Sequence, residues 1–212
     1  MTEIRDLYLD VAQAAAELLA APEVAAAWDE PSALAQLSVR GLAGHLAAQV
    51  FFIPSMLADP VPVEPVVGLD EYYARAAWIG TDLDTEFNQS IRAGGEKVAG
   101  EGPEQLAART AACIADLRKT LSFEPDRPVR RPNWSGYSVS LDTFVASRML
   151  ELIVHSDDLA HSVGVPTPQF PAEAVQTVVD VLTRIALRRH GQTAVLRALS
   201  RSERAPASIS AL

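Results

Sequence analysis

Apolar residues recur at helical spacing through most of this chain and predict a protein built from long α-helices. Near the N-terminus Ile4, Leu7 and Val11 follow one another at intervals of three or four residues, which is the spacing of a single buried helix face. The same pattern continues to Trp28, and Pro31 then interrupts it. We therefore predict one helix over Thr2–Trp28.

The pattern divides the next part of the chain into a helix, a loop and a weaker helical stretch. Ser38 is a typical N-cap residue, so a second helix is predicted to begin after it and to continue through Ile53. Three prolines in Asp59–Gly68 predict a loop. A third helical stretch begins near Leu69 and includes Phe87. Four glycines are expected to weaken or break it: Gly94, Gly95, Gly100 and Gly102.

The second half of the chain predicts further helices around one long connection. Pro103 suits the first turn of a helix that reaches about Leu121. Prolines and a glycine over 125–136 indicate a connection that contains a short extended piece. The clearest helix is Ser140–Val163. After it we predict helices over Pro171–His190 and Thr193–Arg201, with a glycine between them.

Composition supports an all-α fold. Hydrophobic residues make up 49% of the chain and aromatic residues only 6%, and alanine, the best helix former, dominates the apolar set. Long helices joined by shorter loops are typical of a helix bundle. We predict a bundle over residues 1–166 and a C-terminal helical extension, residues 167–212, packed on that bundle.

Charge and cysteine content restrict the partners and the compartment. The net charge of −9 argues against binding to nucleic acid or to anionic membranes. One stretch is positively charged instead, and we interpret it as a solvated helix face. It contains Arg184, Arg188, Arg189, Arg197, Arg201 and Arg204. A basic leader and an apolar run of 18 residues are both lacking, and there is a single cysteine. These features predict a cytoplasmic protein.

Two residues of the clearest helix have the spacing of metal ligands. Glu151 and His155 are four residues apart, so both side chains lie on one helix face. The helix around them is apolar nearly all round, and a buried charge is normally paired or bound to a metal. An ordinary ion pair between Glu151 and Arg148 on the preceding turn is the alternative.

His45 completes a candidate ligand set from a second helix. It lies among glycines and alanines, which let another backbone or a ligand come close. A lone histidine on an apolar helix is more often a core residue, but two helices that both carry imidazole are harder to explain that way. Two histidines and a glutamate, with a fourth position left for water or substrate, form a known catalytic zinc set. Ni²⁺ or Fe²⁺ is also compatible with imidazole.

Two more side chains are candidates for catalysis. Asp158 is three residues after His155, where it can accept a hydrogen bond from a ligating imidazole. It is equally well explained as a carboxylate on the helix surface. Arg148 can pair with Glu151 or with substrate, and the loop that carries Trp134 and Tyr137 can wall a pocket.

Several segments resemble one protein family. The chain resembles the DinB-like metal-binding helix bundles and, within them, the mycothiol-dependent maleylpyruvate isomerase family. The resemblance is carried by Trp28 with Pro31–Leu34, by Leu42–Leu46, by Arg148–Ala160, and by His190–Gly191 with Ala194–Leu199. It implies a four-helix core with a divalent metal, usually zinc, held by the residues that match His45, Glu151 and His155. It also implies mycothiol as a thiol cosubstrate.

The resemblance and the residues together lead to one main hypothesis. The isomerase carries a larger C-terminal domain, so a thiol S-transferase, as in shorter relatives, is the closer expectation, with isomerisation retained. A thiol would bind the open metal position, lose its proton and attack a small electrophile. The alternatives are a hydrolase that uses metal-bound water and a non-catalytic helix-bundle binding protein. The oligomeric state stays open, with a homodimer as one option.

Overall fold

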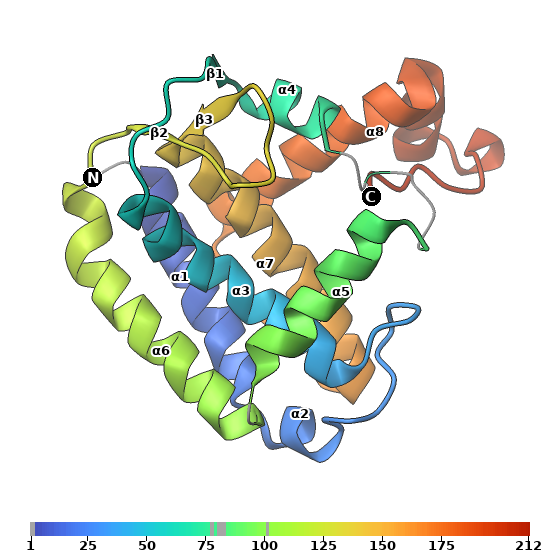
Figure 1. Ribbon diagram of the computed structural model, residues 1–212. Helices are drawn as coiled ribbons and strands as arrows, with labels where there is room; N and C mark the ends of the chain where they lie inside the picture. The colour runs from blue at the N-terminus through green and yellow to red at the C-terminus, as the bar shows by residue number, and fades with distance from the viewer. Residues whose placement is uncertain (1–2, 77–78, 80–83, 101) are drawn as a thin grey trace.

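Four long helices form the centre of the protein. The computed structural model describes residues 3–76, 79, 84–100 and 102–212. The central helices are α1 (Glu3–Leu19), α3 (Val39–Ala58), α6 (Pro103–Thr120) and α7 (Leu141–Val163). Around the bundle α1 contacts α7 and α6, and α3 contacts the same two helices from the other side. Helices α1 and α7 run in one direction, and α3 and α6 run in the opposite direction (Figure 1). The prediction of an all-α bundle is confirmed.

Helices α3 and α7 begin where the sequence predicts, and α7 also ends at the predicted glycine. The Ser38 hydroxyl accepts a hydrogen bond from the backbone N–H of Gly41 and caps α3. The Ser140 hydroxyl accepts one from Thr143 and caps α7, and Gly164 ends α7 in the left-handed conformation. Each cap satisfies a backbone group that the helix itself leaves without a partner.

The N-terminal prediction of one continuous helix is wrong. Helix α1 ends at Leu19, and a separate short helix, α2 (Pro22–Ala26), follows it. Proline has no backbone N–H, and its ring clashes with the preceding turn in a helix interior. Pro22 therefore cannot continue α1, but it is suited to begin α2. Thr2, the predicted first residue, lies outside the described part of the chain.

The third predicted stretch contains two helices. The first is α4 (Leu69–Ala74) and the second is α5 (Glu86–Ala99), which includes Phe87; residues 77–78 and 80–83 lie outside the described part of the chain. Of the four glycines expected to weaken or break the helix, Gly94 and Gly95 lie inside α5. The helix ends at Gly100, whose φ is 63°.

Helices α3 and α5 approach each other closely enough for their backbones to touch. A Cβ atom at Gly44 would lie only 2.0 Å from the carbonyl oxygen of Gly95, and a Cβ at Gly95 would lie 2.4 Å from the carbonyl oxygen of Gly41. Side chains at these positions would therefore force the helices apart. Glu96 accepts hydrogen bonds from Ser38 and Arg40 at 2.6 Å each, which also ties α5 to the start of α3.

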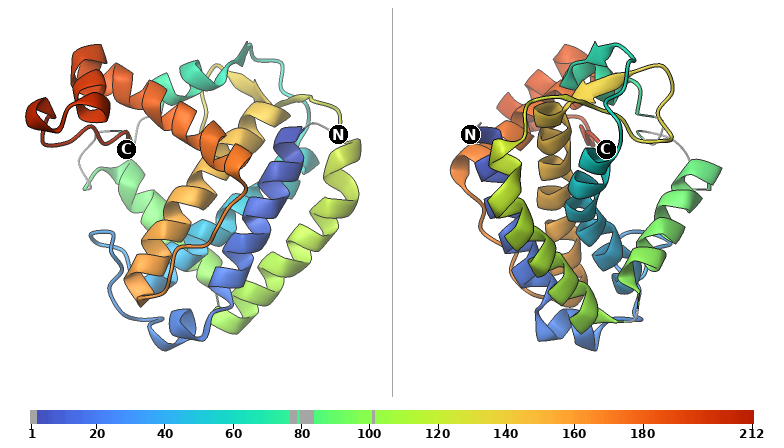
Figure 2. Two further views of the ribbon diagram at one scale, coloured as in Figure 1. Left: turned by 180° about the vertical axis from the view of Figure 1, so that it is seen from behind. Right: turned by 60° about the vertical axis from the view of Figure 1, so that its left-hand side comes forward.

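A small sheet and a long helix complete the fold at the end where α7 begins. Strand β3 (Ser138–Ser140) lies between β1 (Val66–Val67), to which it is parallel, and β2 (Pro128–Val129), to which it is antiparallel. Helix α8 (Ala172–Ser200) has non-helical backbone angles at Gly191. This interruption separates two helical segments at the predicted glycine. Helix α8 contacts α7, α1 and α4, and Figure 2 shows it crossing the outside of the bundle. Short 3-10 helices cover Leu121–Phe123 and Ser202–Arg204.

Within the described residues, helix α3 bears on the expectation that no segment crosses a membrane. By length and composition alone it could cross one. However, 61% of its apolar window is buried inside the protein, and α5, α6 and α7 all contact it. These contacts are those of a central core helix.

Replacing Gly44 with alanine should lower the free energy of unfolding by about 1–3 kcal/mol, because the new methyl group meets backbone atoms that cannot rotate away. Gly94→Ala is the matched control, since nothing lies within 4 Å of a Cβ at that position of the neighbouring helix. Its better helix propensity should raise stability by up to about 1 kcal/mol. Urea unfolding followed by circular dichroism measures both. Equal stability of Gly44→Ala and the unsubstituted protein would contradict the close helix contact.

Candidate functional site

Three side chains predicted as metal ligands meet where α3 packs on α7. His45 comes from α3, and Glu151 and His155 lie one turn apart on α7. One carboxylate oxygen of Glu151, Oε2, lies 3.5 Å from His45 Nε2 and 3.3 Å from His155 Nε2. Each residue offers one ligand atom, and the three ligand atoms lie within 4.8 Å of one another. The two imidazole rings meet edge to face, with centroids 4.7 Å apart.

The carboxylate of Glu151 is ionised in these surroundings. Burial raises its pKa, but the hydrogen bonds with His155 and His45 and the positive charge of Arg148 outweigh burial and hold the pKa well below the usual range. Burial lowers the pKa of His45, and the hydrogen bond with Glu151 opposes that effect only in part. His45 is therefore neutral at neutral pH, which is the form that binds metals.

Asp158 fixes the second imidazole. Its Oδ2 lies 2.9 Å from His155 Nδ1, so Nδ1 carries a hydrogen and Nε2 faces Glu151. Burial alone would lower the pKa of His155, but the hydrogen bonds to Asp158 and Glu151 raise it to about 9. Without a metal the ring therefore holds a proton at Nε2 at neutral pH. A metal ion at this position would replace that proton.

The donor set fits a divalent metal such as zinc. Two ligands held about 2.0–2.1 Å from a zinc ion at the tetrahedral angle lie about 3.3 Å apart. The two histidine-to-glutamate separations, 3.5 and 3.3 Å, are close to this value. The side chains of His45 and His155 are 19% and 18% exposed, so small molecules have access to the site. Two imidazoles, one carboxylate and an open side are the pattern of a catalytic zinc site.

A buried hydrogen-bonded chain supports His45, and sequence reasoning missed its central member, Gln49. Its Nε2 donates to the backbone carbonyl of His45 at 2.9 Å and lies 3.2 Å from His45 Nε2. Its Oε1 accepts from Arg148 at 2.6 Å, and Arg148 also donates to the Tyr72 hydroxyl at 3.0 Å. Gln49 follows His45 by four residues in α3, so the i, i+4 spacing on one helix face was the signal that could have identified it.

Arg148 has a different role from the ion pair with Glu151 that the sequence offered as an alternative to a metal site. The described structure gives it hydrogen bonds with Gln49, Tyr72 and Ser147, whereas Glu151 pairs with the two histidines. Its guanidinium is almost fully buried, so it acts on Glu151 through its charge and on His45 through Gln49.

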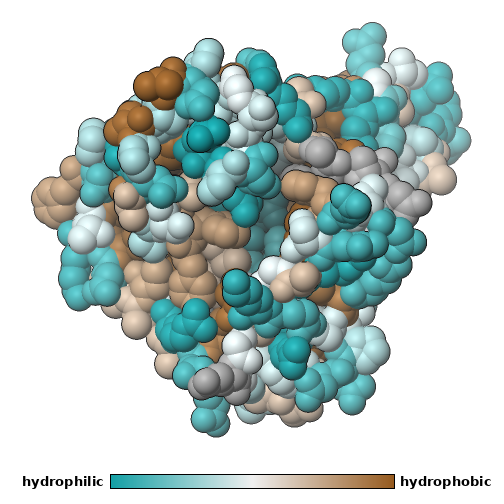
Figure 3. Space-filling model, in the orientation of Figure 1, coloured by the Kyte–Doolittle hydropathy of each residue, from teal (hydrophilic) through white to brown (hydrophobic). Residues whose placement is uncertain are grey.

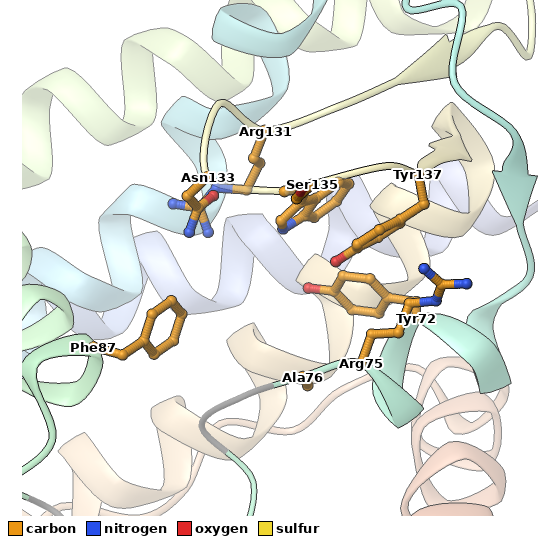
Figure 4. A pocket seen from close by; sticks show the side chains of 9 residues that line it. Tyr72, Arg75, Ala76, Phe87, Arg131, Asn133, Ser135 and Tyr137 are labelled. Carbon is orange, nitrogen blue, oxygen red and sulfur yellow. The ribbon is translucent and has the colours of Figure 1, made fainter.

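A cavity of about 330 Å³ opens beside this chain. Tyr72 and Arg75 border it on the α4 side, Phe87 of α5 borders it below, and the loop between β2 and β3 covers it with Arg131, Trp134 and Tyr137. Figure 4 shows Tyr72, Arg75, Phe87, Arg131 and Tyr137 around the opening. The space-filling view is hollowed at the centre of the same face (Figure 3). Trp134 and Tyr137 thus line this cavity, whereas none of the three candidate ligands does. The cavity shares Tyr72 with the chain that reaches His45.

The remaining histidines lie away from the metal ligands. His161 is exposed on α7. His190 Nε2 lies 2.8 Å from the backbone carbonyl oxygen of Ser210, near the end of the chain. Neither belongs to the group of three. For His161 this agrees with its position six residues after His155, which turns it to a different helix face.

Comparison with known proteins assigns the chain to a family. The model of the family described as mycothiol maleylpyruvate isomerase N-terminal domain matches residues 8–160. This match covers the bundle and all three candidate ligands. No curated protein and no solved structure matches the chain. Because the match spans well over half of the sequence, the chain belongs to the mycothiol maleylpyruvate isomerase N-terminal domain family.

Proposed function

We propose that this protein is a zinc-dependent enzyme that joins the thiol mycothiol to a small electrophile, either as an S-transferase or, by addition and elimination, as an isomerase. The observation that carries the proposal is the convergence of His45, Glu151 and His155 from two helices. Membership of a mycothiol-related family supports the choice of thiol. The reducing cytoplasm is the compartment that keeps such a thiol reactive.

Some residues of the site would bind the metal, and others position these ligands. His45, Glu151 and His155 would hold the metal, which would supply Lewis acidity to lower the pKa of a thiol that reaches it. Asp158 holds the Nδ1 hydrogen of His155 and keeps Nε2 directed at Glu151. Arg148 holds Gln49, which in turn holds His45. We therefore assign Asp158 and Arg148 as positioning residues.

The proposed chemistry balances without an additional oxidant or reductant. In transfer to a chlorinated aromatic compound, the thiol sulfur forms a bond to the ring carbon, chloride leaves with its bonding pair, and the thiol proton passes to solvent. In isomerisation, the sulfur adds to a conjugated double bond, the carbon–carbon bond rotates, and elimination restores the double bond and releases the same thiol. In both reactions the thiolate is the nucleophile.

Asp158→Asn should weaken zinc binding by about 10- to 100-fold, because a neutral amide holds the ligating imidazole less firmly in its tautomer. Asp157→Asn is the matched control. It removes the same charge one residue away, from an exposed carboxylate that accepts a hydrogen bond from Thr167. Competition titration with a chromogenic zinc chelator measures both affinities. Equal affinities of the two variants would remove Asp158 from the site.

The reaction itself is tested with mycothiol and 1-chloro-2,4-dinitrobenzene, followed by absorbance of the thioether product. We expect a zinc-dependent rate that His155→Ala reduces to the uncatalysed background, because that variant loses a metal ligand. His161→Ala removes an exposed imidazole from the same helix and should retain the full rate. Chloride release without added thiol would favour the hydrolase, and a zinc-loaded protein inactive with mycothiol and further electrophiles would favour a binding protein.

A further inference from the structure

Arg131 lines the cavity and has no ion-pair partner among the described residues. Two other arginines nearby have carboxylate partners: Arg75 pairs with Glu71, and Arg130 pairs with Glu64. In the described part of the chain Arg131 forms no ion pair, although it is half-buried. Burial and the nearby charge of Arg148 lower its pKa. A half-buried cation without an anion is an unfavourable arrangement that a bound anion would relieve.

The position of Arg131 leaves its hydrogen-bond donors available. The guanidinium lies over the ring of Phe52, 4.1 Å from the ring centroid. Such stacking occupies the flat face of the guanidinium and leaves its N–H groups, which lie in the plane, directed outwards. Asn133 lines the same cavity. Two in-plane N–H groups of an arginine bind a carboxylate in a fork geometry.

The rest of the cavity suits a flat ring. Trp134 and Tyr137 are stacked with centroids 5.3 Å apart and an angle of 14° between their planes. Tyr72 lies against Trp134 with centroids 5.2 Å apart. A volume of about 330 Å³ is at the lower end of the range for small-molecule sites. The described lining residues include two arginines and no carboxylate, so the preferred ligand is an anion.

We infer that this cavity binds an aromatic carboxylic acid, with the carboxylate on Arg131 and the ring against Trp134 and Tyr137. The assignment of this acid as the electrophilic substrate rests on the proposed function. The Tyr72 hydroxyl joins the cavity to Arg148, Gln49 and then His45. The cavity that would hold the acid is thus linked to the candidate metal ligand His45 through three intervening side chains. Binding of the acid itself does not require the metal.

Titration calorimetry with benzoate tests the inference, with neutral benzamide as the comparison ligand. We expect benzoate to bind at least about tenfold more tightly than benzamide, and Arg131→Gln to weaken benzoate at least about tenfold, as loss of a charge-assisted bidentate pair predicts. Arg109→Gln is the matched control, because Arg109 also lies over a phenylalanine, Phe51, at 5.1 Å, but is exposed. It should bind benzoate as the unsubstituted protein does.

Two further measurements keep the result decisive. Arg131→Lys retains the charge without the fork, so its affinity for benzoate should lie between those of Arg131→Gln and the unsubstituted protein. If Arg131→Gln folds poorly, a weaker affinity of Arg131→Lys than of the unsubstituted protein is the test instead. Each titration is made with metal-free and zinc-loaded protein. Benzoate binding by a chain that takes up no zinc would support the cavity while overturning the metal proposal. Absence of benzoate binding, or equal affinity in Arg131→Gln, would overturn the inference whatever the metal does.

Discussion

A buried carboxylate between two imidazoles sets the arrangement of the protein's centre. Removing an ionised carboxylate from water costs several kcal/mol, and only close partners with good geometry offset that cost. Glu151 finds its partners on two helices, His155 on its own helix and His45 on α3. The register of α3 against α7 is therefore restricted by this contact. A shift of one turn on either helix would separate Glu151 from His45 and leave the buried carboxylate with His155 alone.

Two further sets of contacts on α3 hold His45 in position beside Glu151. On one side, Gly44 directly precedes His45 and lets α5 approach until the two backbones touch. On the other side, Gln49 and Arg148 carry the hydrogen-bonded chain to Tyr72 and to the aromatic cavity. The same helix thus supplies a metal ligand, a close helix contact and a link to the cavity. This helix is as apolar as a membrane-spanning helix and yet lies mostly inside the protein.

The sequence revealed those features that depend on local spacing. The capped ends of α3 and α7 and the shared face of Glu151 and His155 follow from residues a few positions apart. The break at Pro22 was also a local signal, and it was missed because the apolar pattern continues past it. Gly95 differs from Gly94 only through the helix that faces it. The roles of Gln49 and Arg131 likewise depend on partners from distant segments, and a pattern within one helix does not contain those contacts.

Metal content is the direct measure of whether His45, Glu151 and His155 hold one divalent metal. The protein would be purified without chelators or a histidine tag and analysed by plasma mass spectrometry, together with Glu151→Gln, which leaves the imidazoles in place. We expect about one zinc, nickel or iron per unsubstituted chain and a large loss in the variant, with helicity unchanged. No stoichiometric metal in the unsubstituted protein, even after zinc is added back, would contradict this expectation.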